Sequence, residues 1–95
     1  MRDTTDTAIT TVQIVYLARL REAFGTANET LPLPAGAVTT VGEVLALLAA
    51  RGGAWAAELA HGRALRIAVK HAMASRATPV HAGDELALFP PVTGG

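Results

Sequence analysis

The pattern of apolar and polar positions along the chain predicts four short strands. In the first of them Val12, Ile14 and Tyr16 fall on one face, and Val15 and Leu17 fall on the other. Because both faces are largely apolar, the second face is either covered by the fold or offered to a partner. The four predicted strands cover residues 12–18, 28–33, 65–69 and 86–89.

A helix is predicted to begin near Thr40. Thr40 and Glu43 have the spacing of a capping box, in which the threonine hydroxyl and the glutamate carboxylate bond the free amides at the helix start. The apolar residues that follow recur at the spacing of one helical face; they are Val41, Val44, Leu45 and Leu48. Gly52-Gly53 is expected to stop this helix.

The remaining segments are predicted to be a second helix and two turns. The shorter helix is expected over residues 54–60, with Gly62 as its terminator. Residues 19–25 break the strand pattern and are expected to form a polar turn that ends at Gly25. Residues 82–85 are expected to form the turn that feeds the last strand.

This order of elements predicts a two-layer α+β domain. The first two strands are close in sequence and can pair as a hairpin, and the long helix can then bury its Val/Leu stripe against the sheet. We therefore expect a flexible N-terminal extension over residues 1–11, one folded domain over residues 12–89, and an extended C-terminal tail over residues 90–95.

Composition narrows the class of protein. The chain has 95 residues, of which 51% are hydrophobic and 17% are charged, and its formal net charge is zero. This balance favours one compact core and lacks the basic footprint of a nucleic-acid-binding protein. The start of the chain has no apolar signal-peptide core, and no segment is long enough to span a bilayer. A cytoplasmic protein without a membrane partner is expected.

An internal active site is not supported by the residues. The histidines are His61, His71 and His81, and their spacing matches no metal-binding pair, so no metal site is expected. Asp84-Glu85 follow a glycine and are expected to be turn residues, and Lys70 is expected to be a solvated surface lysine. Ser75 has no arrangement around it that resembles a catalytic triad. The chain has no cysteine, which excludes disulfides and a persulfide formed on this chain.

The C-terminus is the most informative segment. Pro90 and Pro91 lack amide protons and fix φ, so they leave the sheet ladder and hold the chain extended. From Pro90 to Gly95 the chain reaches at most roughly 20 Å. Gly94 and Gly95 have no side chains, so such an end can thread a channel in which any Cβ would collide. We expect a stalk that presents a free α-carboxylate.

The terminal run Phe89-Pro90-Pro91-Val92-Thr93-Gly94-Gly95, together with Gly83-Asp84-Glu85, resembles one family. It is that of the sulfur-carrier small subunit of molybdopterin synthase, within the ubiquitin-like β-grasp carriers that include the thiamine sulfur carrier. Weaker matches are the first strand followed by Ala18-x-x-Arg21-Glu22 and Gly25, and the Ala68-Val69 strand. The resemblance covers roughly residues 12–95. It departs at Lys70-His71, where the family often has Asn after Ala-Val.

The resemblance implies a ubiquitin-like β-grasp fold and a cycle of sulfur transfer. An E1-like adenylating enzyme would use ATP and Mg²⁺ to convert the Gly95 carboxylate to a transient acyl-adenylate. Sulfur from a donor protein would displace AMP and leave a Gly95 thiocarboxylate, which would deliver sulfur to cyclic pyranopterin monophosphate within the large subunit. The chain would need no permanently bound cofactor, and it would not be an enzyme on its own.

Within this interpretation each residue of the tail has an expected role. Gly95 is the reacting residue, and Gly94, Thr93, Val92, Pro91 and Pro90 form the part that passes into the partner. The candidates for the partner-binding surface are Phe89, Leu88, Leu17 and Arg21, with Val92 also a candidate for apolar contact. For Leu17 and Leu88 an ordinary place in the core is an equal alternative.

Three other functions remain open at this point. The acceptor of sulfur could belong to thiamine biosynthesis or tRNA thiolation, because the acceptor leaves no mark on this chain. The same activated terminus could form an isopeptide bond with a lysine, as a protein modifier does. The domain could also be an interaction module whose glycines have no chemical role.

Overall fold

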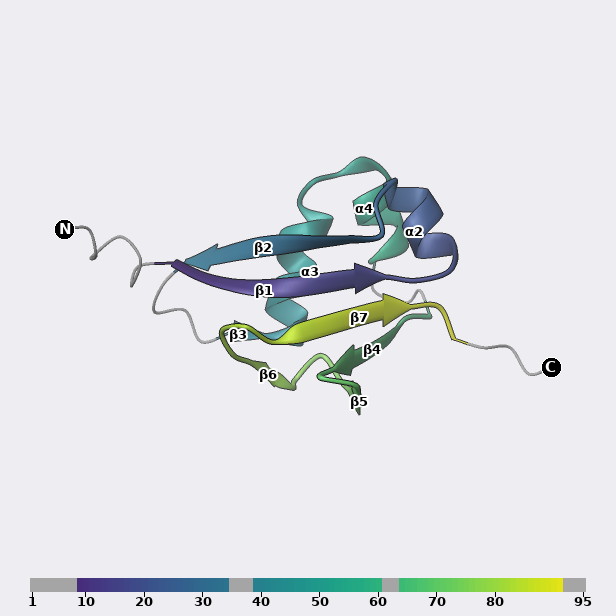
Figure 1. Cartoon of the computed structure of the whole chain (residues 1–95). Coiled ribbons are helices and arrows are strands. Elements are labelled where there is room, and N and C mark those ends of the chain that lie inside the picture. Colours follow the sequence, from purple (N-terminus) through teal and green to yellow (C-terminus); the bar gives the residue numbers. More distant parts are fainter. Residues whose placement is uncertain (1–8, 35–38, 61–63, 92–95) are drawn as a thin grey trace.

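The computed structural model describes residues 9–34, 39–60 and 64–91. Five strands form a mixed sheet in the order β2-β1-β7-β4-β5 (Figure 1). They are β1 (Ile9–Tyr16), β2 (Asn28–Pro34), β4 (Arg66–Val69), β5 (Ala72–Ala74) and β7 (Glu85–Phe89). The helices are α2 (Arg19–Phe24), α3 (Val41–Ala49) and α4 (Gly53–Glu58). A separate two-stranded sheet pairs β3 (Thr39–Thr40) with β6 (Pro79–Val80).

The pairing of the central strands places the end of β7 beside the end of β1. β1 is antiparallel to β2, with Val12 opposite Leu31, and parallel to β7, with Ile14 opposite Leu86. Parallel neighbours end at the same edge of a sheet, and here the amide of Leu17 donates to the carbonyl of Leu88 over 3.0 Å. The chain therefore leaves β7 beside the point where it leaves β1.

The hydrophobic core lies between the sheet and α3, as the sequence pattern predicted. Figure 1 shows α3 crossing behind the sheet. The four apolar residues of the predicted helical stripe are each at most 1% exposed. At about 1.5–3 kcal/mol for each Val or Leu buried, this stripe is a principal source of adhesion between the two layers. Thr40 is the N-cap of α3, and its Oγ1 accepts the Glu43 amide over 3.3 Å.

The predicted polar turn over residues 19–25 is wrong, because residues 19–24 form the helix α2. Leu20 is 1% exposed and anchors this short helix to the core. Phe24, one helical turn further along, packs against the same core. The prediction that Gly25 ends the segment is confirmed: it is left-handed, with φ 74°, and its amide donates to the Arg21 carbonyl.

Gly52 and Gly53 do not stop α3, although the sequence pattern had predicted that they would. Helix α3 already ends at Ala49, with Ala50 as a right-handed cap, and Gly52 is the N-cap of the next helix rather than the stop of α3. Gly53 is the first residue of α4, which ends at Glu58 instead of reaching residue 60. Gly52 has φ 79° and Gly53 has φ 55°, so the pair supplies the tight reversal between two helices. Gly62 lies outside the described residues.

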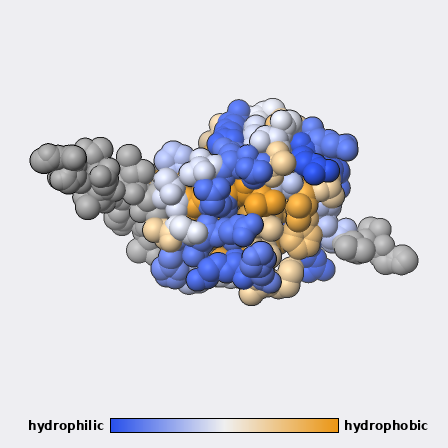
Figure 2. Space-filling model, in the orientation of Figure 1, coloured by the Kyte–Doolittle hydropathy of each residue, from blue (hydrophilic) through white to orange (hydrophobic). Residues whose placement is uncertain are grey.

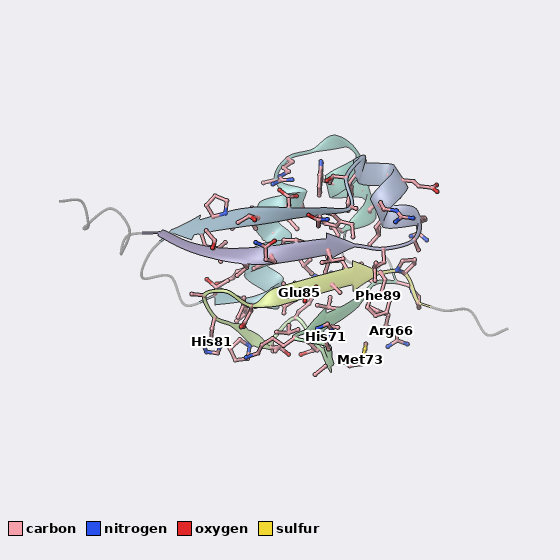
Figure 3. The ribbon with its side chains drawn as sticks, viewed as in Figure 1. Arg66, His71, Met73, His81, Glu85 and Phe89 are labelled. Carbon is pink, nitrogen blue, oxygen red and sulfur yellow. The ribbon has the colours of Figure 1, made fainter. Side chains whose placement is uncertain are left out.

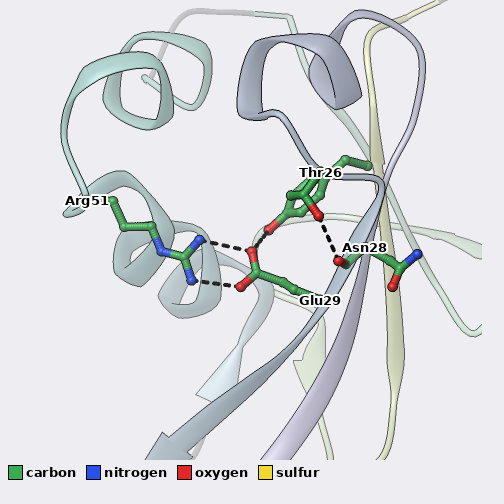
Figure 4. Close-up of polar contacts among 5 residues, drawn as sticks. Thr26, Asn28, Glu29 and Arg51 are labelled. Atoms are coloured by element: carbon green, nitrogen blue, oxygen red, sulfur yellow. Dashed lines mark hydrogen bonds and ion pairs between the residues drawn. The ribbon is translucent and has the colours of Figure 1, made fainter.

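An ion-pair and aromatic cluster fastens α2, α4 and the sheet together. Arg51 makes two 2.9 Å hydrogen bonds to the carboxylate of Glu29, and the buried Tyr16 hydroxyl donates to the same carboxylate over 2.6 Å (Figure 4). Phe24 and Trp55 stack at 3.9 Å, and the Arg51 guanidinium lies 4.5 Å from the Trp55 ring centre. The hydrogen bonds from Arg51 lower the pKa of Glu29, and burial raises the pKa of Tyr16.

No helix in the described part of the chain combines the length and the apolar character needed to cross a bilayer.

Candidate functional site: a sheet surface beside the C-terminal stalk

The stalk begins where the sheet ladder stops. Phe89 is the last residue of β7, and it lies opposite Arg66 as the final pair of the β4–β7 ladder. Pro90 and Pro91 follow and are half-buried. Because proline has no amide proton, Pro90 cannot extend the ladder, and the chain separates from the sheet there. The predicted tail residues Val92, Thr93, Gly94 and Gly95 lie outside the described residues.

The sheet face that points away from α3 carries an apolar surface. The strand registers place Val15, Ala87, Ala68 and Met73 in one row across β1, β7, β4 and β5. Leu17 and Phe89 lie one step nearer to the stalk. We call these six residues the outer sheet patch: Val15, Leu17, Ala68, Met73, Ala87 and Phe89. Figure 2, seen from this side, shows hydrophobic residues gathered over the central strands.

Two members of the patch are exposed enough to matter for binding. Leu17 is 41% exposed and Met73 is 63% exposed, and both are among the exposed large hydrophobic residues of the described chain. Phe89 is half-buried at the stalk end (Figure 3). Contiguous apolar residues left in water are typical of surfaces that bind a partner. The geometry therefore gives this face, rather than an internal cavity, as the candidate site.

For Leu88 the structure decides between the two predicted places, and Met73, a large exposed residue of the patch, was not predicted. Leu88 is 0% exposed and belongs to the core, because the alternation along β7 turns Leu86 and Leu88 inward and leaves Ala87 and Phe89 outward. Arg21 is exposed on α2. Met73 was missed because β5 has only three residues, too few for a period of two to be recognised.

The opposite end of β7 carries ionisable residues with structural roles. The Asp84 side chain is nearly buried, and it accepts the His81 amide over 2.8 Å and lies 3.6 Å from the Lys70 amine. This is the turn role that the sequence predicted for Asp84. Glu85 lies 3.6 Å from His71. No group of three or more potential metal ligands gathers within residues 9–34, 39–60 and 64–91.

A hollow of about 400 Å³ lies on the other side of the molecule, against α3. Half of its lining residues are alanines, and the others are Gly42, Leu45, Leu59 and Arg76. These side chains include no acid–base pair and no nucleophile, so the hollow offers no catalytic arrangement.

Comparison with known proteins identifies relatives of this architecture. Residues 14–95 match the model of the ThiS family. The chain is 38% identical over 85 residues to the molybdopterin synthase sulfur carrier subunit of Escherichia coli, covering 88% of this chain and 99% of that one.

Two solved structures show the same fold. One is the small archaeal modifier protein 1 of Haloferax volcanii, with 26% identity, a TM-score of 0.70, and coverage of 87% of this chain and 99% of that one. The other is the complex of subunits 1 and 2 of the molybdopterin-converting factor from Helicobacter pylori, with 21% identity, a TM-score of 0.60, and coverage of 90% and 99%. The predicted ubiquitin-like β-grasp fold is thus confirmed, and the chain belongs to the ThiS family.

Proposed function

We propose that this chain is the sulfur-carrier small subunit of a molybdopterin synthase, and that the Gly95 carboxyl carries the sulfur. The observation that supports this most directly is the outer sheet patch beside the stalk, since a tail that acts inside a partner needs a docking surface at its base. The 38% identity to a molybdopterin synthase sulfur carrier subunit points to the same function.

The chemistry follows from the properties of a terminal carboxyl group. A free α-carboxylate is ionised at neutral pH, with a pKa of about 3.5, and is a poor acyl electrophile. An E1-like adenylating enzyme with ATP and Mg²⁺ would convert it to an acyl-adenylate and release pyrophosphate. Sulfide (HS⁻) supplied by a donor protein would then attack the acyl carbon and expel AMP, which leaves a thiocarboxylate and releases a proton. The chain has no cysteine, so the sulfur is held by the terminus alone.

The outer sheet patch and the stalk would have different roles in docking. The outer sheet patch would rest on the large subunit, with Leu17, Met73 and Phe89 as its main apolar contacts. Pro90 and Pro91 would stiffen the stalk and so lower the entropy lost when it inserts. Gly94 would let the chain pass a narrow channel and bring Gly95 to cyclic pyranopterin monophosphate. Without the large subunit the chain is not expected to catalyse a reaction, and we propose the cytoplasm as its location.

Reconstitution tests this proposal. Thiocarboxylated chain, the large subunit from the same organism and cyclic pyranopterin monophosphate are expected to yield molybdopterin, with one chain consumed per sulfur transferred. A chain that lacks Gly95 is expected to bind the large subunit without yielding product. Product formation that does not depend on the thiocarboxylate would contradict the proposal.

A second candidate is a protein modifier. The similarity to the small archaeal modifier protein 1 of Haloferax volcanii favours it, because the same acyl-adenylate could acylate a lysine amine instead of accepting sulfur. ATP-dependent appearance of the chain on lysines of other proteins, lost when Gly95 is removed, would support this function. Sulfur carriage for thiamine biosynthesis or tRNA thiolation would instead appear as a loaded tail that the large subunit does not discharge.

A further inference from the structure

Arg66 stands at the edge of the outer sheet patch, next to the stalk. It is the first residue of β4, and the burial pattern of that strand turns Ile67 and Val69 inward and leaves Arg66 and Ala68 on the outer face. Its cross-strand neighbour is Phe89, and directly opposite residues have Cβ atoms about 4.5–5.5 Å apart. Figure 3 shows Arg66, Met73 and Phe89 at the same end of the sheet.

The Arg66 guanidinium has no carboxylate partner in the part of the chain that the structure describes. Arg19 is paired with Glu58 at 3.1 Å and Arg51 with Glu29 at 2.9 Å, whereas no such contact forms at Arg66. Glu85, the acidic residue of β7, lies four residues before Phe89 and contacts His71 instead. The stalk end of this face therefore carries an unpaired positive charge beside apolar side chains.

Docking of a protein on the patch changes the surroundings of this charge. Covering Phe89 and Met73 removes water from Arg66, and a guanidinium that loses water without gaining an acceptor carries a large cost. A carboxylate meets this need best, because its two oxygens match the fork of N–H donors. Such a pair beside the base of the stalk would also fix the direction in which the tail leaves the interface.

We propose that Arg66 selects the partner of this chain by forming an ion pair with an aspartate or glutamate of the molybdopterin synthase large subunit. This inference rests on the proposed function, and it adds a chemical requirement: the face of the large subunit that covers the patch is apolar and has a carboxylate at the edge nearest its tail channel. Apolar contacts then provide adhesion, and the ion pair provides orientation and discrimination between partners.

Calorimetric titration of the full chain into the large subunit from the same organism tests this proposal. Arg66→Glu is expected to weaken binding by about tenfold or more, since it places two carboxylates together. Arg66→Lys, which keeps the charge but loses the fork, is expected to fall between the wild type and Arg66→Glu. The matched control is Arg76→Glu. Arg76 lies against Gly42 of α3, on the helical layer and away from the outer sheet patch. The control substitution is expected to change binding by less than about twofold.

The outcomes separate this inference from the proposed function. Arg66→Glu binding within about twofold of the wild type, or a similar loss in Arg76→Glu, overturns the role of Arg66 and leaves the proposed function standing. A wild-type chain that does not bind the large subunit overturns both. Circular dichroism of each variant shows whether it is folded, and loss of fold in Arg66→Glu is not expected because the side chain is exposed. Should it occur, the Arg66→Lys titration decides: affinity equal to the wild type overturns the bidentate pair.

Discussion

The tip of the β4–β5 hairpin holds two non-glycine residues in the left-handed region, which gives a prediction about stability. Lys70 has φ 51° and His71 has φ 71°. Val69 pairs directly with Ala72, so the loop has two residues, and positive φ at both of them defines a type I′ turn. Asn-Gly is the dipeptide that this turn prefers, and the present chain lacks it.

Replacing the tip by Lys70→Asn and His71→Gly is expected to stabilise the fold by about 1 kcal/mol. A left-handed conformation costs a non-glycine residue about 1–2 kcal/mol, and the extra freedom of glycine in the unfolded chain cancels about 0.5–1 kcal/mol of the gain at His71. Asparagine tolerates the conformation better than lysine. The lost contact between Lys70 and Asp84 is 3.6 Å long with the lysine side chain 68% exposed, so its removal matters little.

Thermal and urea unfolding followed by circular dichroism measure this effect. The stabilised variant is expected to melt about 4–8 °C above the wild type. The control is Lys70→Ala with His71→Ala, which removes the same side chains without relieving the backbone, and it should gain nothing. An Asn-Gly variant no more stable than this control would refute the reasoning. Sulfur loading should be unchanged, because the turn lies at the opposite end of β7 from the stalk.

Four further predictions concern the outer sheet patch, the ion-pair and aromatic cluster, and the end of α2. Leu17→Asp is expected to weaken binding to the large subunit about tenfold or more in a calorimetric titration while the chain stays folded. Tyr16→Phe is expected to lower the free energy of unfolding by about 1 kcal/mol in urea, since a buried hydrogen bond to Glu29 is lost. Arg51 lowers the pKa of Glu29 below its ordinary 4.5, so this stabilisation is present above that pH and is lost as the pH falls through the lower, folded-state pKa. Glu29→Gln should lack this part of the acid dependence in urea titrations across pH. Gly25→Ala is expected to cost about 1 kcal/mol, because alanine is strained at φ 74°.

The sequence predicted the elements whose pattern is local. Alternation identified β1, and the recurrence of Val41, Val44, Leu45 and Leu48 identified α3, because burial on one face imposes a period that can be read directly. The helix α2 was not predicted, since one buried leucine and one aromatic residue hold it through contacts with distant segments. The strands β3, β5 and β6 have two or three residues each and exist only through pairing.

The candidate site was predictable in part. The Phe-Pro-Pro run placed a stalk after the last strand, and Phe89 was expected to face a partner. For Leu17 and Leu88 the partner-binding surface and the core were equal alternatives, although the alternation that exposes Phe89 must bury Leu88. Met73 and Arg66 could not be placed on the patch from sequence, because only the strand register brings them beside Ala68 and Phe89.

The intact mass of the chain tests the central claim most directly. The chain is incubated with ATP, Mg²⁺, a sulfur donor and its cognate adenylating enzyme, and is compared with a chain that lacks Gly95. A mass gain equal to the replacement of one oxygen by sulfur, seen only in the full chain and only with ATP, is the predicted result. No gain, with an adenylating enzyme shown to be active on another carrier, would contradict the sulfur-carrier function.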